Sequence, residues 1–171
     1  MSITMAENAA ASKSDGRQVL TFDLGGETYG VDILRVQEIR GWSPVTRIPK
    51  APRHVLGVLN LRGSIVPIVD LRVRFGLQRA EFTPLTVIIV LSIESAAGRR
   101  EFGLVVDSVS DVVDLEADAM RETPSLGGKL SAEVIDGLAT VADHMLILLN
   151  VDELVGRDLA AASPPALAGA A

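Results

Sequence analysis

The sequence predicts a mainly β protein, a pair of small barrels or curled sheets with few short helices. Short runs of apolar residues alternate with polar residues at the two-residue period of half-buried strands. The chain also contains an internal repeat, and closing each copy into its own sheet would remove exposed strand edges. With 171 residues, 48% of them hydrophobic, the chain can bury the core of one domain or of two small joined units.

The clearest strand signals lie near the beginning. In Gln18–Leu24, three apolar residues alternate with Val19, Thr21 and Asp23, and Glu27–Val31 follows after Gly25-Gly26. Two glycines between alternating runs favour a tight hairpin, because both can adopt positive φ. Further strands are expected at Ser64–Val69, Val87–Ile93, Phe102–Val106, Val109–Val113 and Met145–Val151.

Helical signals are few. Asp32 is placed to cap a short turn that ends at Val36, and Asp70 to cap a helix over Leu71–Phe75 that Gly76 would end. A third short helix is expected over Ser131–Asp136.

The internal repeat consists of two gapless stretches in the same order. Tyr29-Gly30-Val31 reappears 73 residues later as Phe102-Gly103-Leu104, and at the same offset Val36, Glu38 and Ile39 correspond to Val109, Asp111 and Val112. Gly57–Leu71 aligns with Gly137–Val151 at a constant offset of 80. This order indicates a duplicated β unit.

The two ends of the chain lack any periodic apolar pattern. Residues 1–16 are rich in Ala, Ser and Asp, and residues 158–171 in Ala and Pro, so both are expected to be flexible tails. The first residues do not resemble a signal peptide, and no run reaches the roughly 18 apolar residues of a membrane span. We therefore expect a cytoplasmic protein without direct membrane insertion.

The residues offer no catalytic set. The chain has no cysteine, and its two histidines, His54 and His144, occupy unrelated contexts without metal-ligand spacing. Ser64 and Ser131 lack the flanking glycines of a nucleophile elbow, and no glycine pair resembles a phosphate loop. We expect no enzyme activity, no metal and no cofactor.

Charge is distributed unevenly. The net charge is −6, yet Arg35 to Arg79 contains nine Lys and Arg residues against Glu38 and Asp70, which leaves −13 for the rest of the chain. A polarised chain suits protein partners. The alternative is a small β-barrel that binds nucleic acid through residues 35–79, although an acidic protein repels phosphates and the aromatic residues are few.

Two polar residues stand among apolar ones. Glu38 lies in VQEIR, where alternation places Val36, Glu38 and Arg40 on one strand face, and Arg62 lies in NLRG before a likely turn at Gly63. Each could be an ordinary structural residue, but a residue fixed by its loop is also well placed to meet a partner.

At these positions the sequence resembles the CheW family of chemotaxis coupling proteins. The resembling segments are YGVDILRVQEIRGWSPVTRIP, GVLNLRGSIVPIVDLRVRFG, FGLVVDSVSDVV and GLATVADHMLILLNVDEL. They run from about Arg17 to Arg157 in the order of the family.

The resemblance implies a fold of two SH3-like five-stranded β-barrels packed together. The domain would span 17–157, with barrel 1 built from about 17–55 plus 137–157 and barrel 2 from about 56–136. It also implies a non-catalytic adaptor that couples chemoreceptors to the histidine kinase CheA, recruited from the cytoplasm to membrane-associated receptor arrays. The chain has no room for a kinase module or a receiver, which favours a stand-alone coupler.

By the same resemblance, the cytoplasmic tips of receptors dock in a groove between the barrels, and CheA binds through its regulatory domain. The positions that match the receptor-contacting segments of the family are Val36, Glu38, Ile39, Gly57, Arg62, Val109, Asp111 and Val112. The residues that face the kinase are not identified.

Overall fold

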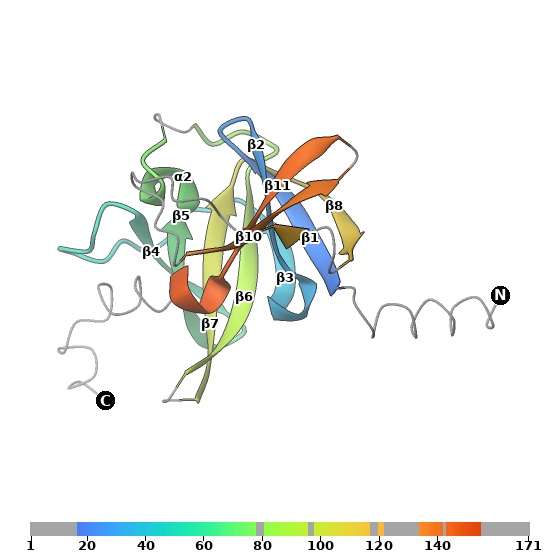
Figure 1. The fold of residues 1–171 in the computed structure, drawn as a ribbon. Helices are drawn as coiled ribbons and strands as arrows, with labels where there is room; N and C mark the ends of the chain where they lie inside the picture. Colours follow the sequence, from blue (N-terminus) through green and yellow to red (C-terminus); the bar gives the residue numbers. More distant parts are fainter. Residues whose placement is uncertain are drawn as a thin grey trace.

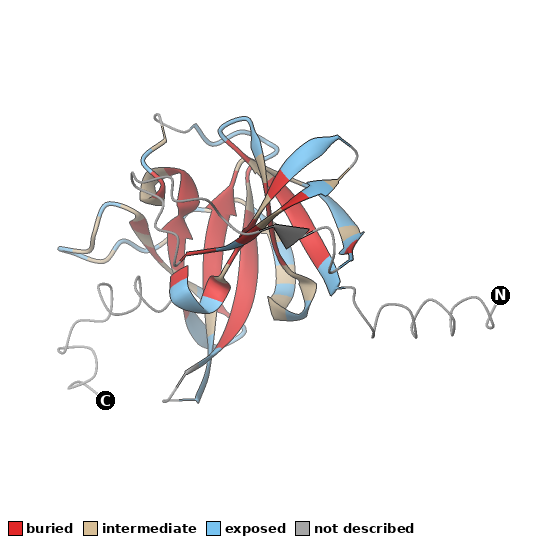
Figure 2. Ribbon diagram, viewed as in Figure 1, coloured by how far each residue is buried: buried red, intermediate tan, exposed pale blue. Residues whose placement is uncertain are grey.

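The computed structural model describes residues 17–77, 81–95, 98–116, 120–121, 134–141 and 143–154. Both expected tails lie outside the described residues. Two β-sheets pack against each other, and buried residues concentrate where they meet (Figures 1 and 2).

The first sheet has the strand order β8-β1-β2-β11-β10-β9. It is mixed, because β11 runs parallel to β2 while the other pairs are antiparallel. Its strands are β1 (Arg17–Leu24), β2 (Glu27–Asp32), β8 (Ser108–Leu115), the two-residue β9 (Met120–Arg121), β10 (Ile135–Val141) and β11 (His144–Leu149).

The second sheet has five strands in the order β3-β6-β7-β5-β4. Here β5 runs parallel to β7, as β11 does to β2 in the first sheet. Its strands are β3 (Val36–Gly41), β4 (Val55–Leu61), β5 (Ser64–Asp70), β6 (Val87–Ser95) and β7 (Gly98–Val106). The predicted mainly β fold, with five main strands in each sheet, is confirmed.

The described helices are short. In the 3-10 turn η1 (Ile33–Arg35) the Asp32 carboxylate accepts from the N–H of Leu34, and in α2 (Leu71–Arg74) Asp70 caps in the same way. Residues 151–154 form one further turn. The expected helix at Ser131–Asp136 is wrong at its end, because Ile135 and Asp136 belong to β10, where pairing with β11 buries Ile135. Its first residues lie outside the described part.

Strand registers show that the two copies of the repeat fold alike. Gly30 pairs with Leu148, and its counterpart Gly103 pairs with Ile68, the counterpart of Leu148. The bulge that precedes Gly57 in β4 recurs before Gly137 in β10. At both Gly30 and Gly103 a Cβ would overlap neighbouring side chains, Val19 and Ile68 respectively. Each parallel pair therefore depends on a glycine at the same place.

Each copy of the repeat contributes one strand to the sheet that is formed mainly by the other copy. The strand β3 follows β2 through η1 but pairs with β6 of the second sheet, and β8 follows β7 but pairs with β1 of the first. The expected division into 17–55 plus 137–157 and 56–136 stays a prediction; in sheet membership, β3 joins strands of the second unit and β8 joins strands of the first. The exchange links the sheets covalently and by hydrogen bonds, so neither copy forms a sheet alone.

The described residues form three hydrophobic clusters. The largest, which we call the central core, lies between the sheets and receives residues from both, including Phe22, Tyr29, Leu91 and Phe102. Each sheet also has a small cluster of its own, around Leu146 in the first and Ile68 in the second. The relative positions of the two sheets are therefore fixed by apolar packing.

Candidate partner-binding surface

Six of the predicted receptor-binding residues lie on the two exchanged strands, β3 and β8, which are edge strands of their sheets. Val36, Glu38 and Ile39 on β3 correspond through the repeat to Val109, Asp111 and Val112 on β8. The register agrees, since Val36 pairs with Leu91 and Val109 with Phe22, each beside a bulge. We call these six residues and Arg62 the edge-strand surface.

The aliphatic residues of this surface divide into two matched pairs. Val36 and Val109 are half-buried and both pack against the central core. Ile39 and Val112 are 43% and 44% exposed. The inner pair positions the strands, and the outer pair leaves apolar surface open to a partner.

Arg62 joins the edge-strand surface through Glu38. It lies in the β4–β5 turn with φ 52°, followed by Gly63 at φ 89°, and the amide of Asn60 accepts from the N–H of Gly63 at 2.9 Å. Two positive φ values in a two-residue connection are typical of a type I′ hairpin turn. Arg62 Nη2 donates to Glu38 Oε1 at 2.5 Å, and the Arg62 side chain remains 70% exposed.

The counterpart of Glu38 has a different environment. Asp111 forms no ion pair within the described part of the chain, and its carboxylate accepts only from the N–H of Val112, at 2.8 Å. Its backbone is held by Thr21, whose hydroxyl donates to the Asp111 carbonyl and accepts from its N–H. The two halves of the surface are thus alike in backbone but different in charge.

Gly57 lies apart from this surface. It is buried with φ 153°, and a Cβ there would overlap the carbonyl of Thr46. Thr46 and Val58 exchange two backbone hydrogen bonds, at 2.8 and 2.9 Å, which hold the chain after β3 against β4. Its position suits it to closing the second sheet.

A buried arginine that the sequence did not single out connects the two sheets. Arg72 is 1% exposed, and its guanidinium binds both oxygens of Asp70, at 2.9 and 3.1 Å. Its Nη1 donates to Asp107 at 3.0 Å, and the other Asp107 oxygen accepts from the N–H of Gly25 in the β1–β2 turn. Since Asp107 immediately precedes β8, this network holds the start of that strand.

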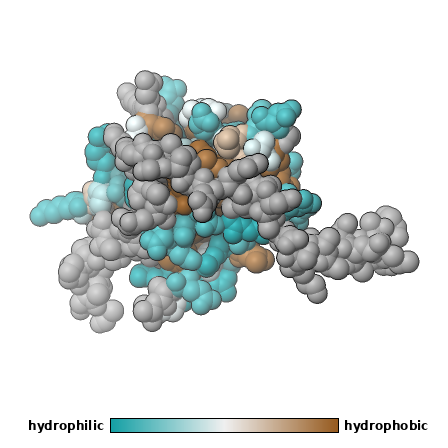
Figure 3. All heavy atoms as spheres, viewed as in Figure 1, coloured by the Kyte–Doolittle hydropathy of each residue, from teal (hydrophilic) through white to brown (hydrophobic). Residues whose placement is uncertain are grey.

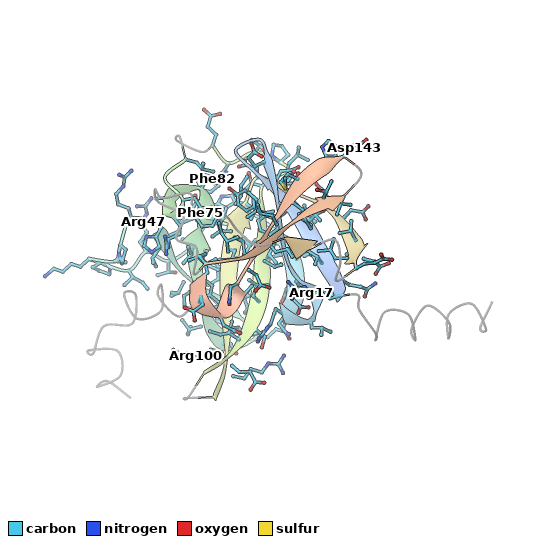
Figure 4. All side chains as sticks on the ribbon, in the orientation of Figure 1. Arg17, Arg47, Phe75, Phe82, Arg100 and Asp143 are labelled. Atoms are coloured by element: carbon cyan, nitrogen blue, oxygen red, sulfur yellow. The ribbon has the colours of Figure 1, made fainter. Side chains whose placement is uncertain are left out.

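The charge of Arg72 is retained in spite of its burial. Loss of solvent lowers the pKa of Arg72, but hydrogen bonds and charge from Asp70, and then from Asp107, outweigh it and raise that pKa above its ordinary value. The guanidinium also lies 5.1 Å from the ring centroid of Phe82, which is labelled in Figure 4. The Phe82 ring stacks on Trp42 with centroids 4.0 Å apart.

The described residues contain no cluster of three or more His, Cys, Asp and Glu side chains that could hold a metal ion. Searching the same residues for a helix long and apolar enough to cross a bilayer finds none. His54 lies in the loop before β4 of the second sheet, whereas His144 begins β11 of the first sheet.

The basic stretch 35–79 is not one continuous cationic face. Arg72 is buried with its two aspartates, Arg62 binds Glu38, and Arg35 binds Asp152 at 2.7 Å. This pairing leaves fewer free cations than the sequence suggests, which disfavours a groove for a phosphate backbone.

Comparison with known proteins agrees with the resemblance. Residues 18–158 match the model of the CheW-like domain. A chemotaxis protein CheW from Klebsiella aerogenes is 45% identical over 148 residues, covering 86% of this chain and 87% of that protein. One from Rhizobium meliloti is 37% identical over 150 residues, covering 88% and 94%.

The fold is also similar to that of a solved CheW structure. The crystal structure of the scaffolding protein TtCheW from Thermoanaerobacter tengcongensis superimposes with a TM-score of 0.72 at 30% identity, over 79% of this chain and 84% of that one. The chain therefore belongs to the CheW family of non-catalytic chemotaxis scaffolding proteins, as the four sequence segments predicted.

Proposed function

We propose that this scaffold couples chemoreceptors to the histidine kinase CheA, with the receptor tip bound at the edge-strand surface. The supporting observations are the corresponding edge strands β3 and β8, on which Ile39 and Val112 are exposed, and the Glu38–Arg62 ion pair, in which the arginine side chain is 70% exposed. Exposed apolar side chains and arginine are both common components of a protein interface. Gly57 contributes by shaping the second sheet rather than by contact.

The proposed mechanism is binding without chemistry. A scaffold that holds receptor and kinase together lets receptor occupancy bias the kinase between active and inactive arrangements, which is a coupling free energy. The place of action would be the cytoplasmic side of membrane-associated receptor arrays. The regulatory domain of CheA would need a surface separate from β3 and β8.

Reconstitution tests this proposal. Vesicles that contain a chemoreceptor are mixed with CheA and the chain, and sedimented kinase and its autophosphorylation are measured with and without receptor ligand. We expect ligand-sensitive kinase activity with the wild-type chain, and weak coupling with Arg62→Ala. Sedimented kinase that is indifferent to the presence of the chain would overturn the proposal.

A further inference from the structure

The loop between β3 and β4 projects from the molecule beyond β4 (Figure 1). It carries three exposed cations, Arg47, Lys50 and Arg53. The side chain of Arg47 points away from the ribbon, and the projecting tip is hydrophilic (Figures 3 and 4). Within the described part of the chain, none of the three takes part in an ion pair. Leaving three like charges unpaired on a protein of net charge −6 indicates a surface kept for an external anion.

The loop is anchored at several points although it lacks regular structure. Its start is fixed by the Thr46–Val58 hydrogen bonds, and at its end the His54 carbonyl accepts from the N–H of Asp70 at 2.7 Å. Between them Ala51 packs against the central core. The cations are therefore carried on a loop anchored at both ends and in the middle.

Two consecutive turns set the spacing of the cations. The N–H of Ala51 donates to the Ile48 carbonyl at 3.4 Å, and that of Val55 donates to the Pro52 carbonyl at 3.0 Å. Pro49 and Pro52 restrict the backbone within these turns. A loop conformation that is already formed in the free protein lowers the entropy cost of binding.

Lys50 adds an independent observation. Its φ is 64°, at the third position of a turn whose second residue is Pro49. This position of a type II turn favours glycine, and a residue with a Cβ is strained there. The chain carries a lysine where glycine would fold at lower cost, which indicates that the charge has a use.

The chemistry of the partner follows from the surroundings of the loop. A nucleic-acid site would combine cations with free aromatic faces, but Trp42, at the start of the loop, already stacks on Phe82. A protein segment rich in Asp and Glu needs only the cations. The loop also joins the first residue of β4, whereas Arg62 follows its last, about 20 Å away at the rise of a seven-residue strand.

We infer that residues 47–53 form a preorganised basic surface that binds an acidic protein segment, separately from the edge-strand surface. This goes beyond receptor coupling and does not depend on it, because the binding can be measured without receptor or kinase.

The test measures fluorescence anisotropy of a labelled, disordered peptide rich in Asp and Glu, titrated with the full chain. A peptide in which Asn and Gln replace the acids is the reference ligand. Arg47→Ala/Lys50→Ala/Arg53→Ala should weaken binding about tenfold or more. Arg17→Ala/Arg99→Ala/Arg100→Ala removes the same charge elsewhere and should weaken it less than about twofold at about 0.15 M salt, where distant charges are screened.

A second variant separates rigidity from charge. Pro49→Ala/Pro52→Ala keeps all three cations and should lower the affinity several-fold with an unchanged melting temperature. If that variant shows no cooperative thermal unfolding, the comparison of the two triple variants alone tests the inference. Equal affinity for the acidic and amide peptides, equal effects of the two triple variants, or tighter binding of a single-stranded oligonucleotide of the same charge would overturn the inference.

Discussion

Arg62 Nη2 lies 2.5 Å from Glu38 Oε1, so the turn after β4 is tied to β3, the opposite edge of the same sheet. The side chain of Glu38 is 25% exposed and that of Arg62 is 70% exposed, which leaves most of the Arg62 side chain open to a partner. Surface ion pairs of this kind contribute at most about 1 kcal/mol to stability, whereas an interfacial arginine can dominate binding.

Arg62→Ala should therefore weaken receptor binding by roughly 1–3 kcal/mol and change the free energy of unfolding by less than about 1 kcal/mol. Arg62→Gly should lose as much binding but fold more stably than Arg62→Ala, because glycine suits φ 52°. Calorimetry and urea unfolding measure the two quantities. Normal receptor binding by a folded Arg62→Ala protein would remove Arg62 from the interface.

The aliphatic pairs should respond differently to charge. Val112→Asp should weaken receptor binding while sparing the melting temperature, since Val112 is 44% exposed. Val36→Asp should lower the melting temperature as well, because Val36 packs against the central core. Equal loss of stability in both variants would contradict the division into inner and outer residues.

Gly57→Ala should destabilise the second sheet, because the added Cβ meets the Thr46 carbonyl at a positive φ. Gly41→Ala is the matched control, since a Cβ on Gly41 meets nothing within 4 Å. Thermal unfolding should show a clear loss for the first and little change for the second. Two equally stable variants would mean that the contact of Thr46 with β4 does not close the sheet.

Replacing Arg72 with methionine should cost about 3–5 kcal/mol, because Asp70, which is 3% exposed, would keep a buried charge without its partner. Asp107→Asn leaves the bidentate pair intact and should cost about 1 kcal/mol. Urea unfolding at neutral pH gives both values. An Arg72→Met protein within 1 kcal/mol of wild type would show that the network is dispensable.

The free energy of unfolding should also decrease at alkaline pH, because Tyr29 then loses its phenolic proton. Burial, and then the charge of Glu27, raise the pKa of Tyr29 above its ordinary value of 10.0. The folded state thus holds the phenolic proton more tightly, so this contribution is complete below about pH 10 and is lost as the pH rises further. Tyr29→Phe, which copies Phe102 of the second repeat, should show a smaller decline in urea stability above pH 10. Identical declines would contradict this.

Much of the fold follows from the sequence. The two-residue alternation predicted most strands nearly to their ends. The offsets of 73 and 80 predicted a duplicated β unit, and the structure gives its two copies equivalent registers at Leu148–Gly30 and Ile68–Gly103. Alternation tells which face of a strand is buried but not which sheet it joins. The exchange of β3 and β8 was therefore not predicted.

The candidate site was predicted in part. The resemblance to the family supplied the positions on β3 and β8. The structure pairs Glu38 with Arg62, whereas the sequence analysis singled out the two residues independently of each other. Asp70 was expected only as a helix cap, and the link from Arg72 to Asp107 spans 35 residues, beyond any local pattern. The expected helix at Ser131–Asp136 was wrong at its end, because the pairing of β10 with β11 makes Ile135 and Asp136 part of a strand.

The most direct test of the central claim reverses the ion pair. Arg62→Glu alone and Glu38→Arg alone should each reduce affinity for a receptor cytoplasmic fragment about tenfold or more. The Glu38→Arg/Arg62→Glu double variant restores the internal pair with opposite polarity, and co-sedimentation measures whether binding returns. Continued weak binding by the double variant is the predicted result, because the receptor would contact Arg62 itself. Full recovery would show that Arg62 only braces the turn, and would contradict an edge-strand surface that binds receptors through it.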